Sequence, residues 1–133
     1  MILINEGEKP FQQKLWKVHP TLEPLIQKEL NKLWDAQIIF KVQHSTWVSN
    51  FVPVINKYGE IHMCVYFNNL NRALDKDNYL VPSMEQILQI VSGFEMFSLL
   101  DGFLGYNQVL ASEPDRHKTT FRNKWGTFSF KRI

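Results

Sequence analysis

Residues 51–67 read FVPVINKYGEIHMCVYF, and this stretch decides how the surrounding chain folds. Two apolar runs, residues 51–55 and residues 61–67, flank the sequence NKYG at residues 56–59, whose residue types and length suit the turn of a β-hairpin. Pro53 cannot donate a hydrogen bond to a neighbouring strand, which indicates an edge strand or a bulge. The stretch therefore predicts an antiparallel hairpin.

Upstream of the hairpin, apolar residues recur at three- and four-residue steps from Leu22 to Trp34, while the intervening residues are polar. This spacing predicts an amphipathic helix that begins after Pro20, with Thr21 as its cap. Residues 1–20 show no such period. The sequence thus predicts an extended N-terminal arm at residues 1–20 and a domain, or part of one, at residues 21–133.

Downstream of the hairpin, Ser83 and Gln86 form a capping-box pair that predicts a second helix, which ends at Gly93. The apolar run of residues 96–100 is typical of a buried strand ending at Asp101. Shorter strand candidates close the chain at residues 107–110, 118–122 and 127–131. The predicted class is α+β: two helices with a β-hairpin and antiparallel strands.

Composition narrows the function classes. Apolar residues make up 44% of the 133 residues, which is typical of a globular chain rather than a disordered one. The net charge of +2 excludes a nucleic-acid binder that acts through bulk charge. Basic residues gather only from Arg116 onward, after the last acid, Asp115. That stretch is read first as a solvated strand face, with phosphate binding as the alternative.

The single cysteine and the absence of a targeting pattern indicate the compartment. Cys64 cannot form an internal disulfide, and its apolar neighbours Met63 and Val65 indicate a small buried residue. We find neither a signal-peptide pattern nor an apolar stretch near the ~18 residues of a membrane span. These features predict a soluble intracellular protein, cytoplasmic or nuclear and not secreted, with no membrane partner.

Several stretches, taken in order, resemble the fingers and early palm of gypsy-type LTR-retrotransposon reverse transcriptases, the polymerase region of a Gag-Pol polyprotein. They are residues 25–30 (LIQKEL), 45–54 (STWVSNFVPV), 70–73 (LNRA), 76–79 (KDNY), Pro82, 97–108 (FSLLDGFLGYNQ), 118–121 (KTTF) and 125–128 (WGTF). The resemblance implies a partial right-hand polymerase fold and an RNA-directed DNA polymerase as the ancestral function.

The resemblance also implies roles for individual residues. In this family paired Mg²⁺ ions hold the attacking hydroxyl and the leaving pyrophosphate, and Asp101 matches the first carboxylate that binds them. Tyr106 matches the floor under the sugar that selects deoxynucleotides, and Lys57 resembles the lysine that meets the incoming triphosphate. The implied partners are an RNA or DNA template–primer and a deoxynucleoside triphosphate.

The sequence departs from the family at several places. His62 stands where a triphosphate-binding arginine is expected, and Tyr66 and Asn68 replace an Asp and an Arg. The sequence stops at Ile133 before the aromatic-x-Asp-Asp motif that carries the second metal carboxylates. We therefore expect this chain to be inactive by itself and to need the C-terminal half of the polymerase, or to be a non-catalytic nucleic-acid- or protein-binding remnant.

Without the resemblance, the same residues have simpler interpretations. Asp101 would belong to an Asp-Gly turn, Tyr106 would be a packing aromatic, and Lys57 would be an exposed loop lysine. The four histidines show neither helical i, i+4 spacing nor partner cysteines, a pattern that does not favour a zinc site.

Overall fold

The computed structural model describes residues 2–76, 79–98 and 108–132. The elements, in chain order, are η1 (Pro20–Leu22), α1 (Glu23–Asp35), β1 (Ile39–Lys41), β2 (Ser49–Ile55), β3 (Ile61–Val65), α2 (Asn68–Ala73), α3 (Met84–Val91), α4 (Glu113–Arg116), η3 (His117–Thr119), β4 (Thr120–Asn123) and β5 (Gly126–Phe130). The class is α+β, as predicted from the sequence.

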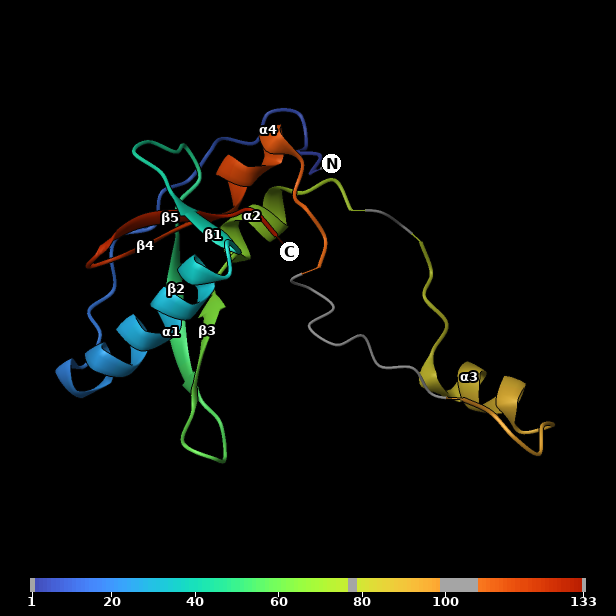
Figure 1. Cartoon of the computed structure of the whole chain (residues 1–133). Coiled ribbons are helices and arrows are strands. Elements are labelled where there is room, and N and C mark those ends of the chain that lie inside the picture. Colours follow the sequence, from blue (N-terminus) through green and yellow to red (C-terminus); the bar gives the residue numbers. More distant parts are fainter. Residues whose placement is uncertain (1, 77–78, 99–107, 133) are drawn as a thin grey trace.

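The strands form one five-stranded sheet in the order β1-β5-β4-β2-β3 (Figure 1). All neighbouring pairs are antiparallel except β2 and β4, which run parallel and pair only at Ser49 and Asn50. Beyond Asn50, β2 pairs with β3 alone, so Pro53 lies where one side of the strand has no partner among the described residues. This is the edge-strand position that its missing N–H requires.

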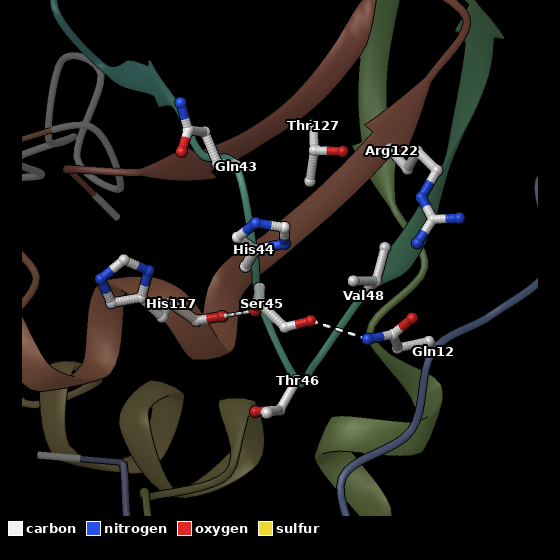
Figure 2. Close-up of a pocket in the computed structure, with 9 residues that line it drawn as sticks. All are labelled: Gln12, Gln43, His44, Ser45, Thr46, Val48, His117, Arg122 and Thr127. Atoms are coloured by element: carbon white, nitrogen blue, oxygen red, sulfur yellow. Dashed lines mark hydrogen bonds between the residues drawn. The ribbon is translucent and has the colours of Figure 1, made fainter.

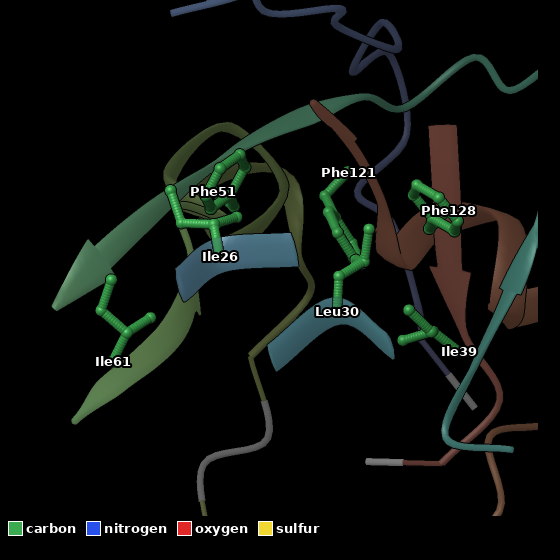
Figure 3. Packing of buried hydrophobic residues seen from close by; sticks show 7 residues of the cluster. All are labelled: Ile26, Leu30, Ile39, Phe51, Ile61, Phe121 and Phe128. Carbon is green, nitrogen blue, oxygen red and sulfur yellow. The ribbon is translucent and has the colours of Figure 1, made fainter. Parts of the chain in front are cut away.

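Helix α1 and the sheet bury one hydrophobic core between them. Ile26 and Leu30, one turn apart on α1, pack against apolar side chains of the strands (Figure 3). The buried members of the cluster are Ile26, Leu30, Ile39, Phe51, Ile61, Phe121 and Phe128. Phe121 and Ile26 are 0% exposed, and full burial of such a side chain stabilises the fold by about 1.5–3 kcal/mol.

The N-terminal arm is attached to the rest of the chain by scattered contacts. Apart from the short helix η1, residues 2–22 contain only isolated bridges, Ile4 with Leu74 and Gln12 with Val48. Asn5 also donates its backbone N–H to the carbonyl of Ala73 at 2.9 Å. The arm is thus extended and tied down, while its division from a domain at residues 21–133 stays a prediction.

Helix α3 differs from the rest of the fold. Its capping box is formed, because Ser83 and Gln86 exchange side-chain-to-backbone hydrogen bonds of 2.8 and 3.3 Å. None of its residues is buried, and Figure 1 shows it apart from the sheet. Among the described residues no helix is long and apolar enough to cross a membrane.

Three sequence predictions were wrong. Thr21 does not cap α1, because it lies within η1 and α1 begins without a side-chain capping hydrogen bond. Residues 96–98, the described part of the expected buried strand, are exposed and not in a strand. A strand needs a hydrogen-bonding partner, and these residues pair with no strand of the described sheet. Cys64 is exposed, because side chains alternate along β3 and Met63 and Val65 occupy the inner face.

The structure also contains elements that the sequence did not predict, namely β1, α2 and the short α4. The last two predicted strands are present with shifted boundaries, as β4 and β5. Of residues 107–110, Leu110 forms an isolated bridge with Arg132.

Candidate functional site

The tip of the β2–β3 hairpin is organised by Asn56. Its Oδ1 accepts hydrogen bonds of 2.9 Å from the backbone N–H groups of Tyr58 and Glu60, and its Nδ2 donates to Glu60 Oε2 at 3.0 Å. Gly59 has a φ of 80°, a left-handed conformation that glycine adopts at no steric cost. The turn is thereby held in one conformation that exposes Lys57.

Lys57 and His62 lie on this same hairpin. Lys57 is exposed, and its Nζ lies 5.0 Å from the centroid of the Tyr58 ring. His62 is exposed on β3 opposite Val54, with its Nε2 3.4 Å from Asn56 Nδ2. A phosphate at the tip would meet one ammonium and one imidazole rather than the five-donor fork of an arginine. The triphosphate-binding roles of both residues stay predictions.

At the base of the hairpin, a buried polar network joins β2 to the N-terminal arm. Gln13 Oε1 accepts from the backbone N–H of Asn50 at 2.9 Å, and its Nε2 donates to Asn69 Oδ1 at 2.8 Å and to the carbonyl of Tyr66 at 3.0 Å. Asn50 Oδ1 in turn accepts from the backbone N–H of Trp16 at 3.0 Å. Both amide side chains are buried and hydrogen-bonded, so the network fixes the arm against the hairpin.

Asp115 forms a second attachment for the arm. Its carboxylate accepts hydrogen bonds of 2.8 Å from Lys118 Nζ and from the backbone N–H of Ile2, and a further one from the Ser112 hydroxyl. Burial alone would raise the pKa of Asp115, but these hydrogen bonds outweigh it and lower the pKa to about 2. Asp115 is therefore a charged structural clamp.

A polar cavity of about 560 Å³ opens beside the β1–β2 connection (Figure 2). It is lined by Gln12, Gln43, His44, Ser45, Thr46, Val48, His117, Arg122 and Thr127. The Ser45 hydroxyl donates to the carbonyl of His117 at 2.7 Å, and Gln12 Nε2 donates to the carbonyl of Ser45 at 2.8 Å. These two bonds join the arm, the β1–β2 connection and η3 around the cavity.

The charge of this cavity favours an anion. Arg122 supplies a guanidinium from β4, and His44 and His117 add imidazoles, while the described residues that line the cavity include no carboxylate. Amides and hydroxyls complete a wall rich in hydrogen-bond donors, which suits a phosphate oxygen. The basic stretch in the sequence included Arg122, but His44 and His117 were missed, because only the fold brings these segments together.

The roles of all four predicted site residues stay predictions, and the structure describes only two of these residues. Asp101 and Tyr106 lie outside the described residues, whereas Lys57 and His62 lie on the same hairpin. Within residues 2–76, 79–98 and 108–132, no three side chains of His, Cys, Asp or Glu gather as a metal would require. The described residues therefore do not by themselves fit a Mg²⁺ site.

Comparison with known proteins identifies relatives of the chain. No protein-family model matches it. The retrovirus-related Pol polyprotein from transposon 297 of Drosophila melanogaster is 21% identical over 136 residues, covering 99% of this chain and 13% of the polyprotein. The enzymatic polyprotein of cauliflower mosaic virus (strain Strasbourg) is 26% identical over 133 residues, covering 97% and 19%.

The fold has close counterparts among solved structures. A foamy viral protease-reverse transcriptase, solved in complex with an RNA/DNA hybrid, superposes with a TM-score of 0.77 at 15% identity, covering 99% of this chain and 18% of that one. The chain thus spans between 13% and 19% of the length of these relatives. Its fold is that of a reverse transcriptase over nearly its whole length, and the chain is a reverse-transcriptase-like segment related to retrotransposon and retroviral Pol polyproteins.

Proposed function

We propose that this chain is the fingers and early palm of an RNA-directed DNA polymerase from a gypsy-type retrotransposon, and that it binds template–primer without extending it. The observation that carries the proposal is the match of its whole fold to a reverse transcriptase that was solved with an RNA/DNA hybrid. In the complete polymerase, nucleotidyl transfer to a deoxynucleoside triphosphate would use two Mg²⁺ ions, with Asp101 as one ligand.

Inactivity of the chain alone follows from the ligands it offers. Two metal ions need several hard oxygen ligands held at fixed positions. Asp101 is the one carboxylate that the resemblance assigns to them, and the described residues contain no cluster that could complete the set. The remaining ligands would come from the C-terminal half of the polymerase.

We place the protein inside the cell, in the cytoplasm or the nucleus.

Primer extension tests this proposal directly. The purified chain, incubated with a labelled primer on an RNA template, Mg²⁺ and deoxynucleoside triphosphates, should add no nucleotide. Addition of nucleotides that the Asp101→Ala variant no longer performs would overturn the proposed inactivity. Addition that persists in the variant would indicate a contaminating polymerase.

A second function, a non-catalytic nucleic-acid-binding module, is favoured by the cavity at Arg122. The described residues that line it supply a cation, imidazoles and hydroxyls but no carboxylate, so a phosphodiester oxygen would meet donors on several sides. Binding through such contacts releases counterions and weakens as salt rises.

The salt dependence of binding distinguishes this cavity from general surface charge. Arg122→Gln should make the slope of log affinity against log salt shallower by about 1, which is the change expected when one phosphate contact is lost. The matched control is Arg72→Gln, which removes the same charge from the exposed face of α2. Equal slopes for the two variants would contradict a phosphate site at Arg122.

A further inference from the structure

A second cavity, of about 360 Å³, lies between the N-terminal arm and the β4–β5 turn. Leu15, Trp16 and Val18 contribute walls from the arm, Phe51 contributes a wall from the sheet, and Trp125 contributes one from the β4–β5 turn. Its volume is at the small end of ligand pockets, which span about 300–1,000 Å³. Aromatic and aliphatic walls of this kind accept a flat apolar ring.

One residue that lines this cavity has a buried polar group without a partner among the described residues. Asn123 lines the cavity and is 4% exposed. Its Nδ2 is buried and has no hydrogen-bond partner among the described residues. The orientation of the amide is fixed, because Oδ1 accepts a 2.9 Å hydrogen bond from the backbone N–H of Trp125, and a flipped amide would set two donors against each other.

A buried donor that makes no hydrogen bond destabilises the folded state. Each unsatisfied buried donor in a folded protein therefore needs a physical explanation. A ligand whose ring carries a hydrogen-bond acceptor would supply the hydrogen bond that Asn123 Nδ2 lacks. The ligand would then lie against the tryptophan walls while its acceptor faces Asn123.

The charges around the cavity suit a ring that is attached to a phosphate. The described residues that line it include Lys17, Lys124 and one acid, Glu23, which pairs with Lys124. Lys124 Nζ also lies 4.8 Å from the centroid of the Trp125 ring. The balance is one net positive charge beside aromatic faces, the combination with which proteins bind single-stranded nucleic acid.

We propose that this cavity binds one unpaired nucleobase of a single-stranded nucleic acid, stacked on Trp16 and Trp125 and hydrogen-bonded through an acceptor to Asn123 Nδ2. The proposal rests on the nucleic-acid binding proposed above and deepens it. It assigns base contact to this cavity and leaves phosphate contact to the cavity at Arg122.

The test compares binding of the full chain to labelled oligomers of equal length. Oligothymidylate should bind about tenfold more tightly than an abasic deoxyribose-phosphate oligomer, because stacking of a single base supplies a gain of that order. Binding of neither oligomer would overturn nucleic-acid binding itself. Equal binding of both would overturn the base cavity and leave phosphate-driven binding standing.

Substitutions of tryptophan test whether the base stacks on Trp16. Trp16→Ala should lower the affinity for oligothymidylate by about tenfold and leave the abasic oligomer unchanged, and Trp16→Phe should restore most of the loss. Trp34→Ala is the matched control, because Trp34 is 47% exposed against 49% for Trp16 but lines a different cavity. An equal loss with Trp34→Ala would overturn the assignment.

The role of Asn123 is tested without changing the protein. An oligomer of difluorotoluene nucleotides keeps the shape of thymine but offers much weaker hydrogen-bond acceptors. It should bind more weakly than oligothymidylate and more tightly than the abasic oligomer. Equal affinity for thymine and difluorotoluene would overturn the hydrogen bond to Asn123 Nδ2.

Discussion

The five-stranded sheet and the segment of residues 79–98 place their apolar side chains in opposite ways. In the core between the sheet and α1, Phe121 and Ile26 are fully buried. In the segment, Leu80 is 90% exposed, Met96 is 89% exposed, and no residue of α3 is buried. A single chain thus contains a packed core and an apolar stretch that has no cover among the described residues.

The comparison shows what holds each region in place. The sheet is held by tertiary burial, which is the main source of stability in proteins. Helix α3 is held by its capping box and by backbone hydrogen bonds, and a helix of its length is marginal in water without packing. We therefore expect the two regions to respond differently to the same kind of substitution.

The largest expected effect is in the core. Phe121→Ala should lower the free energy of unfolding by about 3–5 kcal/mol, because it removes a fully buried ring and leaves a cavity. Leu88→Ala on α3, where the side chain is 57% exposed, should change it by less than about 0.5 kcal/mol. Urea denaturation of both variants measures the difference, and equal losses would mean that α3 is packed.

The clamp at Asp115 should have the next largest effect. Because its pKa is lowered from 3.8 to about 2, the carboxylate contributes stability that is complete above pH 3.8 and is lost as the pH falls through about 2. Asp115→Asn should cost about 2 kcal/mol at neutral pH, since hydrogen bonds to a charged group are lost.

Thermal unfolding at several pH values tests this clamp. The difference between the wild type and Asp115→Asn should narrow as the pH falls from 3.8 towards 2. A difference that stays constant over that range would show that the charge of Asp115 contributes nothing. Glu113→Gln, which changes an exposed acid of the same helix, is the control.

The smallest expected effect lies in the cap of α3. Ser83→Ala should destabilise this helix by about 1 kcal/mol, because it removes the side-chain half of the capping box. Exchange of the amide protons of residues 84–91 should accelerate, while the amides of β4 and β5 should exchange as before. Faster exchange in both regions would indicate that α3 supports the sheet.

Sequence patterns predicted the elements whose signals are local. The period of α1, the turn of the hairpin, the capping box of α3 and the strands β4 and β5 were predicted and are confirmed. Pairing of β2 with β4 could not be predicted, because a parallel contact between Ser49 and Phe121 leaves no local signal. Strand β1 is too short for a recognisable period.

The candidate site was predictable to a smaller extent. Lys57 and His62 were placed on the hairpin by its turn sequence alone, but the cavity at Arg122 joins residues from the arm, the β1–β2 connection, η3, β4 and β5. The alternation along β3 could have shown that Cys64 faces outward with His62. The sequence marked Asp115 only as the last acid before the basic stretch, because its hydrogen bond from the N–H of the distant Ile2 leaves no local signal.

Hydrogen exchange of the chain with and without an RNA/DNA hybrid primer–template tests the central claim most directly. If the chain is a nucleic-acid-binding segment of a reverse transcriptase, the hybrid should slow exchange in the hairpin tip at residues 56–62 and around the cavity at Arg122. Unchanged exchange throughout the chain at saturating hybrid would contradict the account.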